Sequence, residues 1–326
     1  MTISFSAFAL VAVIVYSLGA IVYVYRWRGR VRYARFSQYL RKSWPVFAPL
    51  NCLMYMTTRK SGRRAVLNAD YLKNIELIRS NWLVIRDEAL ALEASGAFDA
   101  AKKPNSVGYY DLGFRTFYKH GWSKFYLIWY GTTHASALRL CPHTVALVNQ
   151  VPGIRGAMFS ILPAGAELSQ HSDPMACSFR YHLGLATPNA RQCSITVDGV
   201  SVPWFDGKDF VFDETYPHRA HNNTASSRLI LMCDVDRPLT LLGRLIHPVY
   251  RFIAKATLVP NTAEDVRGIF SALFFRCAPL RQRTLEFKEK HPRKYKALKF
   301  VLNTAILANM MATVFTVFYV IQEIVT

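Results

Sequence analysis

The chain has 326 residues, enough for one sizeable catalytic domain with accessory segments. Its hydrophobic content of 52% and aromatic content of 13% exceed those of an ordinary soluble domain, so membrane attachment is expected. The net charge of +19 is concentrated beside apolar runs, in residues 26–42 and 276–299, which argues against nucleic acid and favours contact with anionic lipid head groups.

Residues 1–25 are expected to form a transmembrane helix. No charged residue lies between Ile3 and Tyr25, and this length crosses about 30 Å of hydrocarbon as a helix. A cleaved signal peptide is the competing interpretation, but it needs positive charge before its apolar region, whereas here the basic residues follow. Residues 26–64 are therefore a basic juxtamembrane segment in the cytoplasm, within which residues 44–56 are apolar, interrupted by proline and suited to the interface.

Residues 65–150 are expected to form a helical and aromatic-rich N-terminal part of the catalytic domain. Helical periodicity predicts an amphipathic helix over residues 70–92, capped at Asn68 or Asp70. Residues 107–130 alternate glycine, aromatic and basic residues, which predicts strand and loop packed on the domain, with an acyl-binding wall as the alternative. The chain then enters a short predicted helix, residues 142–150.

Short strands follow at regular spacing, separated by turn residues. The turn at Asp198 and Gly199 is a hairpin signal. This pattern predicts a mostly β fold with flanking helices, in which residues 151–238 form a double-stranded β-helix, or jelly-roll, core. The predicted strands cover residues 154–162, 166–171, 178–186, 192–197, 201–204, 209–213 and 228–235.

The pattern changes after residue 238. Residues 239–300 form a basic amphipathic segment, which is expected either to lie in a membrane interface or to pack on the barrel. Residues 301–326 are nearly uncharged and are expected to form a second transmembrane helix, whose basic N-terminal flank lies in the cytoplasm. The six cysteines contain no Cys-x-x-Cys pair, so we expect reduced thiols rather than a disulfide framework or a zinc ribbon.

A candidate metal site begins with His171 and Asp173. A His-x-Asp pair on an extended segment sends both side chains to the same face, where they can hold one ion. His218 supplies a second imidazole, near the end of a segment, residues 209–218, that is predicted to be a strand. Two histidines and one carboxylate are typical of non-haem Fe(II) oxygenases, which keep the opposite face of the ion open for cosubstrate and oxygen. Ten residues later, Arg228 can meet a carboxylate with two parallel hydrogen bonds.

Two alternatives to this ligand set stay open. His221 rivals His218, which is preferred because of the proline before it and its spacing from the downstream arginine. Asp213 or Glu214 rivals Asp173 as the carboxylate, but that choice leaves Asp173 without a role.

Six residues carry a resemblance to a known family by their order and spacing: Ser160, His171, Arg180, His182, His218 and Arg228. In this respect the chain resembles the aspartyl/asparaginyl β-hydroxylases, which are Fe(II)- and 2-oxoglutarate-dependent dioxygenases. The likeness covers residues 151–238. A wider likeness, from residue 44 to the terminal apolar helix, is to a membrane-bound bacterial branch, the lipid A 2-hydroxylases, which hydroxylate a fatty acyl chain.

The resemblance implies a role for each of these residues. His171 and His218 bind the iron, and Ser160 with Arg228 holds one end of 2-oxoglutarate. Animal members that hydroxylate peptides carry glycine where this chain has Asp173, so here Asp173 completes the metal triad. Two further residues face the end of 2-oxoglutarate that chelates iron: Arg180 and His182.

The resemblance further implies an enzyme that uses Fe(II), 2-oxoglutarate and O2 to hydroxylate C2 of a fatty acyl chain of lipid A or a precursor. It would be a multi-pass protein of the bacterial inner membrane with a cytoplasmic catalytic domain. Its partners would be this lipid substrate and anionic lipid head groups, and no nucleic acid. The alternatives are an ornithine-type lipid or the Asp and Asn residues of a peptide as substrate. A third is a non-catalytic metal- or lipid-binding membrane protein, which we expect to have lost part of the ligand set that this chain keeps.

Overall fold

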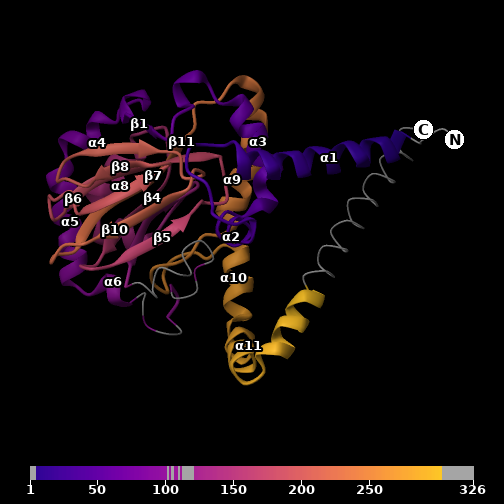
Figure 1. Cartoon of the computed structure of the whole chain (residues 1–326). Helices are drawn as coiled ribbons and strands as arrows, with labels where there is room; N and C mark the ends of the chain where they lie inside the picture. The colour runs from indigo at the N-terminus through magenta and orange to yellow at the C-terminus, as the bar shows by residue number, and fades with distance from the viewer. Residues whose placement is uncertain (1–4, 101–102, 104–105, 109–110, 112–120, 303–326) are drawn as a thin grey trace.

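The computed structural model describes residues 5–302, except 101–102, 104–105, 109–110 and 112–120. Its strands form two antiparallel sheets that lie face to face (Figure 1). The larger sheet has the order β1 (Val66–Leu67), β9 (Asp209–Phe212), β6 (Ser178–Ala186), β11 (Arg228–Asp236), β4 (Ile154–Leu162), β2 (Ser123–Trp129) and β3 (Thr132–Thr133). The smaller sheet has the order β5 (Glu167–His171), β10 (His218–Asn222), β7 (Cys193–Val197) and β8 (Val200–Pro203).

From β4 onward the chain passes back and forth between the two sheets. Strands β4, β6, β9 and β11 belong to the larger sheet, whereas β5, β7, β8 and β10 belong to the smaller one. This alternation is the strand arrangement of a jelly roll, so the predicted core fold is confirmed.

The two faces of the larger sheet pack against different partners. Phe159, Tyr181 and Leu231 point outward into a core shared with helices, because successive residues of a strand face opposite sides. Met158 and Met232 point inward, toward the smaller sheet. The interior between the sheets is therefore apolar apart from the few polar side chains described below.

Short helices cover the outer face of the larger sheet (Figure 1). The chief of these, α5, buries Ile85, Ala89 and Leu92 against it. The helices before the barrel are α1 (Phe5–Arg26), α2 (Phe36–Lys42), α3 (Ala48–Thr57), α4 (Glu76–Ser80), α5 (Trp82–Ala94), α6 (Ala97–Ala100), α7 (Ala135–Leu140) and α8 (Pro142–Asn149). Three single turns of 3-10 helix also precede it: η1 (Pro45–Phe47), η2 (Lys60–Gly62) and η3 (Ala69–Tyr71).

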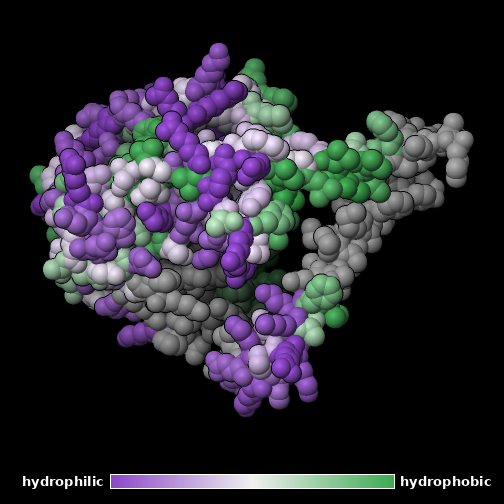
Figure 2. All heavy atoms as spheres, viewed as in Figure 1, coloured by the Kyte–Doolittle hydropathy of each residue, from purple (hydrophilic) through white to green (hydrophobic). Residues whose placement is uncertain are grey.

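Helix α1 projects away from the domain, and its surface is almost entirely apolar (Figures 1 and 2). Within the described residues one helix is long and apolar enough to cross a membrane, the 19-residue stretch Phe8–Arg26, and only 6% of its window is buried. A core helix of a soluble protein would instead be mostly buried. The expected first span is thus supported, whereas the expected second span, residues 301–326, lies almost wholly outside the described residues.

The helices that follow the barrel include α9 (Leu241–Ala256), α10 (Ile269–Arg276) and α11 (Ala278–Lys290). Helix α9 packs on the domain, which was one of the two alternatives expected for its segment, and the membrane-interface alternative stays a prediction. One face packs on the domain, where Tyr250 is fully buried and donates a hydrogen bond to Asn51 Oδ1 at 2.9 Å. The other face exposes leucine, valine and phenylalanine side chains to the surroundings, among them Leu245 and Phe252.

The helix predicted over residues 70–92 is interrupted in the structure. Asn68 caps only η3, by accepting the backbone N–H of Asp70, and the chain then turns at Asn74, whose φ is +65°. Two separate helices, α4 and α5, follow. Asparagine tolerates this left-handed conformation, which a continuing α-helix cannot accommodate.

The strand predicted from residue 209 is confirmed as β9, but its continuation to residue 218 is wrong. Strand β9 ends at Phe212, a buried turn follows, and His218 opens β10 in the other sheet. The turn is closed by Asp213, whose side chain accepts the backbone N–H and the hydroxyl of Thr215. This change of sheet brings His218 beside His171, its partner on β5.

Candidate active site

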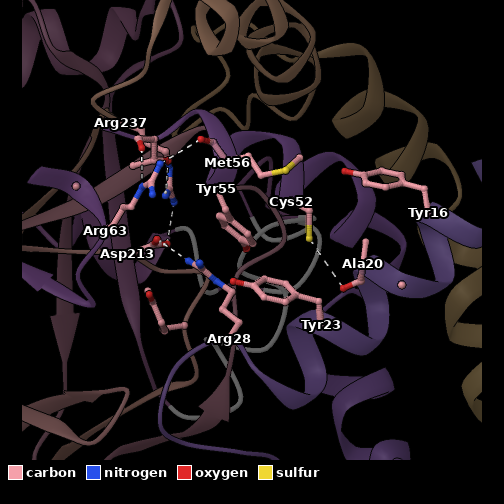
Figure 3. Close-up of a pocket in the computed structure, with 14 residues that line it drawn as sticks. Tyr16, Ala20, Tyr23, Arg28, Cys52, Tyr55, Met56, Arg63, Asp213 and Arg237 are labelled. Carbon is pink, nitrogen blue, oxygen red and sulfur yellow. Dashed lines mark hydrogen bonds and ion pairs between the residues drawn. The ribbon is translucent and has the colours of Figure 1, made fainter. Parts of the chain in front are cut away.

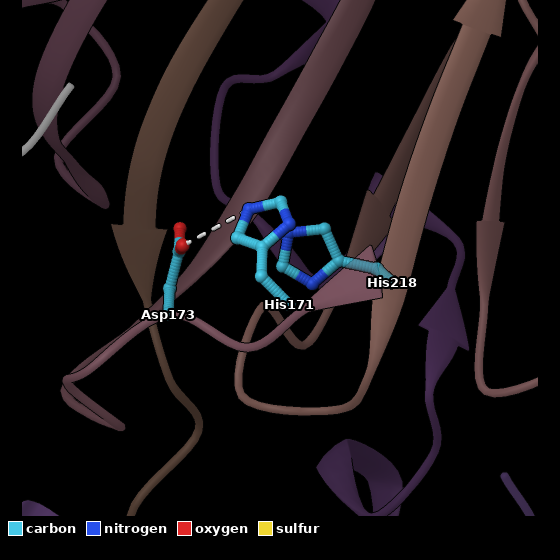
Figure 4. Close-up of side chains that lie close together, drawn as sticks. All are labelled: His171, Asp173 and His218. Carbon is cyan, nitrogen blue, oxygen red and sulfur yellow. Dashed lines mark ion pairs between the residues drawn. The ribbon is translucent and has the colours of Figure 1, made fainter. Parts of the chain in front are cut away.

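Three of the predicted ligands meet at one end of the smaller sheet. His171 ends β5, Asp173 follows two residues later, and His218 opens β10. One potential ligand atom from each lies within 4.8 Å of the others, and the two imidazole centroids are 4.2 Å apart (Figure 4). The arrangement can hold one metal ion by two nitrogens and one oxygen.

Backbone carbonyls fix the orientation of both imidazoles. His171 Nδ1 donates to the carbonyl of Ser169 and His218 Nδ1 to that of Tyr216, each at 2.9 Å. With the proton on Nδ1, Nε2 of each ring keeps its lone pair for a metal. Burial and the neighbouring His171 lower the pKa of His218 to about 4, so its imidazole is neutral at physiological pH, as metal binding requires.

Asp173 is held ionised by the basic side chains around it. Burial alone would raise its pKa, but His218, Arg180 and His171 outweigh burial and hold the pKa below its ordinary value. Arg180 Nη2 lies 3.2 Å from Asp173 Oδ2, while the other carboxylate oxygen is 3.6 Å from His171 Nε2. One oxygen is therefore anchored and the other is turned toward the histidines.

The alternative ligands are committed elsewhere. Asp213 pairs with Arg28 and Arg237, at 2.7 Å and 2.9 Å. Glu214 pairs with Arg180, and His221 lies farther along β10, near the hydroxyl of Ser194. The structure therefore groups His171 and His218 with Asp173 rather than with any of these three.

Arg228 and Ser160 form a second polar group, deep between the sheets. They lie on the adjacent strands β11 and β4, and Arg228 Nη2 donates to Ser160 Oγ at 3.3 Å. Arg228 is 1% exposed, and its guanidinium lies over Trp204 and Trp122, at 4.5 Å and 5.2 Å from their ring centroids. Burial lowers the pKa of Arg228 to about 9.

No carboxylate of the described residues pairs with Arg228, and its Nε has no hydrogen-bond partner among them. A buried cation without a counter-ion is costly. An anionic ligand in the interior would remove this cost, and a carboxylate suits a guanidinium because it can accept two parallel hydrogen bonds.

His182 presents a second unmatched donor to the interior. Trp204 Nε1 donates to His182 Nδ1 at 3.2 Å, and burial together with Arg228 holds the pKa of His182 well below its usual range. A neutral imidazole that accepts at Nδ1 carries its proton on Nε2. This buried Nε2–H has no partner among the described residues, so it is free to donate to a bound ligand.

Arg180 contacts three carboxylates of the protein, whereas its expected role was to contact 2-oxoglutarate. Its guanidinium pairs with Glu214, lies 3.3 Å from Asp234 Oδ1 and also contacts Asp173. It thus orients one candidate metal ligand directly. A contact with 2-oxoglutarate stays a prediction, as do the ligand contacts expected of Ser160, His182 and Arg228.

The sequence did not single out several residues of this interior. Lys124 lies opposite Ser160 on β2, is 4% exposed and pairs with Asp111. The alternation of Trp122, Lys124 and Tyr126 was an available signal, because it places all three on the same face of a strand. Asp234 gave no such signal, since its partner Arg180 lies 54 positions earlier.

The segment after α1 also supports the metal site. Tyr33 forms a hydrogen bond of 2.9 Å with Ser172 Oγ, between the ligands His171 and Asp173. The carbonyl of Lys42 accepts the backbone N–H of Ser172, also at 2.9 Å. Residues that follow the apolar helix α1 therefore hold the loop that carries two of the three ligands.

Residues 79–238 match the profile of the family described as aspartyl/asparaginyl beta-hydroxylase. An ornithine lipid ester-linked acyl 2-hydroxylase of Rhizobium tropici is 35% identical over 127 residues, which cover 39% of this chain and 45% of that protein. The aspartyl/asparaginyl beta-hydroxylase of Homo sapiens is 30% identical over 175 residues, 52% of this chain and 22% of that protein. The alignments thus span less than half of either relative.

Among solved structures, a prolyl-4-hydroxylase of Pseudomonas putida aligns with 52% of this chain and 90% of its own, at 19% identity and a TM-score of 0.31.

Proposed function

Through residues 79–238 the chain belongs to the aspartyl/asparaginyl β-hydroxylase family, and from this premise we propose that it is an Fe(II)- and 2-oxoglutarate-dependent dioxygenase. Its proposed reaction hydroxylates C2 of a fatty acyl chain of lipid A, or of a lipid A precursor, in the cytoplasmic leaflet of the inner membrane. The observation that carries the proposal is the convergence of His171, Asp173 and His218 near an interior with unmatched cationic and N–H donors.

The residues fit an iron ion and a dicarboxylate. Two neutral imidazoles and an ionised carboxylate would hold Fe(II), which when bound supplies the redox chemistry of oxygen activation. Arg228 and Ser160 would bind the distal carboxylate of 2-oxoglutarate, and the Nε2–H of His182 would donate to the same ligand. The aromatic side chains of Phe210 and Phe212, which flank His182, would exclude water from this interior.

A lipid substrate is supported by the exposed apolar helix α1 and by the acyl 2-hydroxylase among the relatives. An enzyme away from the bilayer would have to lift the acyl chain into water at about 0.8 kcal/mol per methylene. A site close to the membrane avoids most of this cost, because only the carbonyl end of the acyl chain has to enter it. C2 is next to the carbonyl and is the shallowest carbon that can be hydroxylated.

The test is mass spectrometry of the lipids of cells with the gene, cells without it, and cells carrying the His171→Ala variant. We expect lipid A to gain one oxygen atom, located at C2 of an acyl chain, only in cells with the wild-type gene. A gain on ornithine lipid instead would favour the second candidate substrate, which the Rhizobium relative suggests. Unchanged lipids together with hydroxylated Asp or Asn in proteins would contradict an acyl substrate.

The ligand assignment has its own test with purified protein. His171→Ala, Asp173→Ala and His218→Ala should each abolish the release of succinate from 2-oxoglutarate, because each removes one ligand of a three-ligand site. His221→Ala is the matched control, since it removes a nearby imidazole outside the cluster. Full activity in Asp173→Gly would exclude this carboxylate from the mechanism.

A further inference from the structure

A second cavity lies apart from the metal cluster, at the junction of α1, α3 and the barrel. Its volume is about 550 Å³. Tyr16, Ala20 and Tyr23 of α1 line one side, and Arg28 and Arg237 lie at the other (Figure 3). None of the three candidate metal ligands lines it. The cavity is therefore apolar and aromatic toward the helix and cationic toward the barrel.

The cationic side carries more positive than negative charge. Three arginines line it, Arg28, Arg63 and Arg237, and the lining contains a single carboxylate, that of Asp213, which pairs with both Arg28 and Arg237. Arg63 has no carboxylate partner within the described part of the chain. Instead it is held by backbone carbonyls, with Nε donating to that of Thr58 at 2.8 Å.

The two inner arginines are built into the site rather than displayed on a surface. Arg28 is 8% exposed and Arg237 is 4% exposed, and the guanidinium of Arg28 lies 3.4 Å from the ring centroid of Tyr55. Nε of each has no hydrogen-bond partner among the described residues. Buried N–H donors of this kind favour a ligand that brings several acceptor oxygens.

The cationic side of the cavity lies beside the basic end of α1, at the depth expected for lipid head groups. The stretch Phe8–Arg26 has 19 residues, and at about 1.5 Å per residue it is roughly 28 Å long, close to the hydrocarbon thickness of a bilayer. Its basic end therefore reaches the interface at Arg26. Trp27 is 62% exposed and Tyr23 is 44% exposed there, as is typical of aromatic residues at a membrane surface.

We propose that this cavity binds the phosphate-bearing head group of a membrane lipid. The phosphate lies against Arg28, Arg63 and Arg237, where planar guanidinium groups donate in pairs to its oxygens. The acyl chains extend from the head group along Gly19 and Tyr16 of α1, toward the middle of the span. This binding requires no iron and no 2-oxoglutarate, so it is independent of the proposed reaction.

Two variants act on opposite sides of the cavity. Gly19→Trp adds a side chain at a position where a Cβ would meet no atom within 4 Å, so it fills the apolar side without a backbone clash. Arg63→Gln removes one exposed cation while leaving the buried pairs of Asp213 intact. The matched controls are Leu18→Trp and Arg64→Gln, which make the same changes one residue away, at exposed positions outside the lining.

The measurement is native mass spectrometry of the full chain in detergent, titrated with phosphatidic acid or with diacylglycerol of the same acyl chains. Wild type and both controls should retain one phosphatidic acid and no diacylglycerol. The two cavity variants should bind phosphatidic acid about tenfold more weakly, since charge-assisted hydrogen bonds are lost or blocked. Equal binding in all five proteins, or equal retention of diacylglycerol, would overturn the proposal.

A second measurement identifies the source of the phosphate. If the occupant is the lipid substrate itself, Gly19→Trp and Arg63→Gln should raise KM for that lipid about tenfold, with the KM for 2-oxoglutarate unchanged. If the occupant is a bulk phospholipid, the KM for the lipid substrate and the KM for 2-oxoglutarate both stay at the wild-type level in these variants, although their binding of phosphatidic acid falls. An enzyme inactive toward every lipid would refute the proposed function, while the titration would still decide the proposal about the cavity.

Discussion

Arg228 shows how a single buried side chain prepares a site for an anion. Its guanidinium lies over two tryptophan rings, donates to Ser160 Oγ and has no carboxylate partner in the described part of the chain. The free-energy cost of removing this guanidinium from water has already been offset by the folding of the whole domain. A dicarboxylate that enters the interior therefore meets a cation that needs little further desolvation.

We predict that Arg228→Lys weakens binding of 2-oxoglutarate roughly ten- to a hundredfold, because lysine cannot make the two parallel contacts and a charged hydrogen bond contributes about 1.5–3 kcal/mol. The measurement is succinate release as a function of 2-oxoglutarate concentration. Arg219→Lys on β10, which is exposed, is the control. A KM for 2-oxoglutarate that stays at the wild-type value would remove Arg228 from cosubstrate binding.

The clustering of the three candidate metal ligands could be predicted from sequence, whereas their supporting residues could not. His171 and Asp173 are neighbours on one local segment, and the order and spacing of His218 and Arg228 were part of the family resemblance. The partners of Arg180 are different, because Glu214 and Asp234 come from a turn and a strand 34 and 54 positions away. From the sequence alone, any other acidic residue could equally well have been the partner of Arg180.

At the scale of elements, the segment between α1 and α3 is part of the active-site architecture. Arg28 Nη2 donates to Thr215 Oγ1 at 2.9 Å, and the backbone N–H groups of Arg30 and Val31 donate to Asp198. Tyr33 then reaches Ser172 in the metal loop. A segment that looks like a basic linker in the sequence thus braces both the turn before His218 and the loop after His171.

We expect Tyr33→Phe to weaken binding of a divalent metal about two- to tenfold, since one buried hydrogen bond contributes about 0.5–1.5 kcal/mol to the position of the loop. Isothermal titration calorimetry with Mn²⁺, in the absence of 2-oxoglutarate, measures this metal affinity directly. Tyr25→Phe makes the same change in a tyrosine that packs on Phe36 and Tyr39. Equal losses in both variants would mean that only general packing is affected.

The strands were predicted to within one or two residues where turn residues separate them, as at β4 and β6. The exception is the passage from β9 to β10. Residues 209–218 contain no glycine, and the aromatic and branched residues among them favour a strand on both sides of Asp213 and Glu214. What ends β9 is the pairing of Asp213 with Arg28 and Arg237, and both of these partners lie outside the segment.

The exposed face of α9 is predicted to contact lipid, because it is apolar and α9 packs beside α3, which in turn packs on α1. The test attaches a nitroxide spin label to the Leu245→Cys variant, made in a Cys277→Ser background and placed in nanodiscs. The label should collide with molecular oxygen more often than with a polar nickel complex. The control is Val200→Cys on β8, which should show the reverse order. The same order at both positions would place α9 in water.

At the scale of the whole molecule, we predict that the catalytic domain lies on the cytoplasmic side. Basic residues follow α1 at Arg26, Arg28 and Arg30, and such flanks stay in the cytoplasm. In intact cells a membrane-impermeant maleimide should label Thr2→Cys but not Val200→Cys, in a Cys277→Ser background. Breaking the membrane should expose the second site. Labelling of Val200→Cys in intact cells would reverse the orientation.

The ion pair between Arg28 and Asp213 has a consequence for biosynthesis, since its members are 185 positions apart. At roughly 5–20 residues per second, Asp213 leaves the ribosome about 10–40 s after Arg28. By then α1 has had ample time to enter the bilayer. Arg28 and Arg63 would therefore reach the membrane surface, among lipid phosphates, before the strands of the barrel and Arg237 have been synthesised.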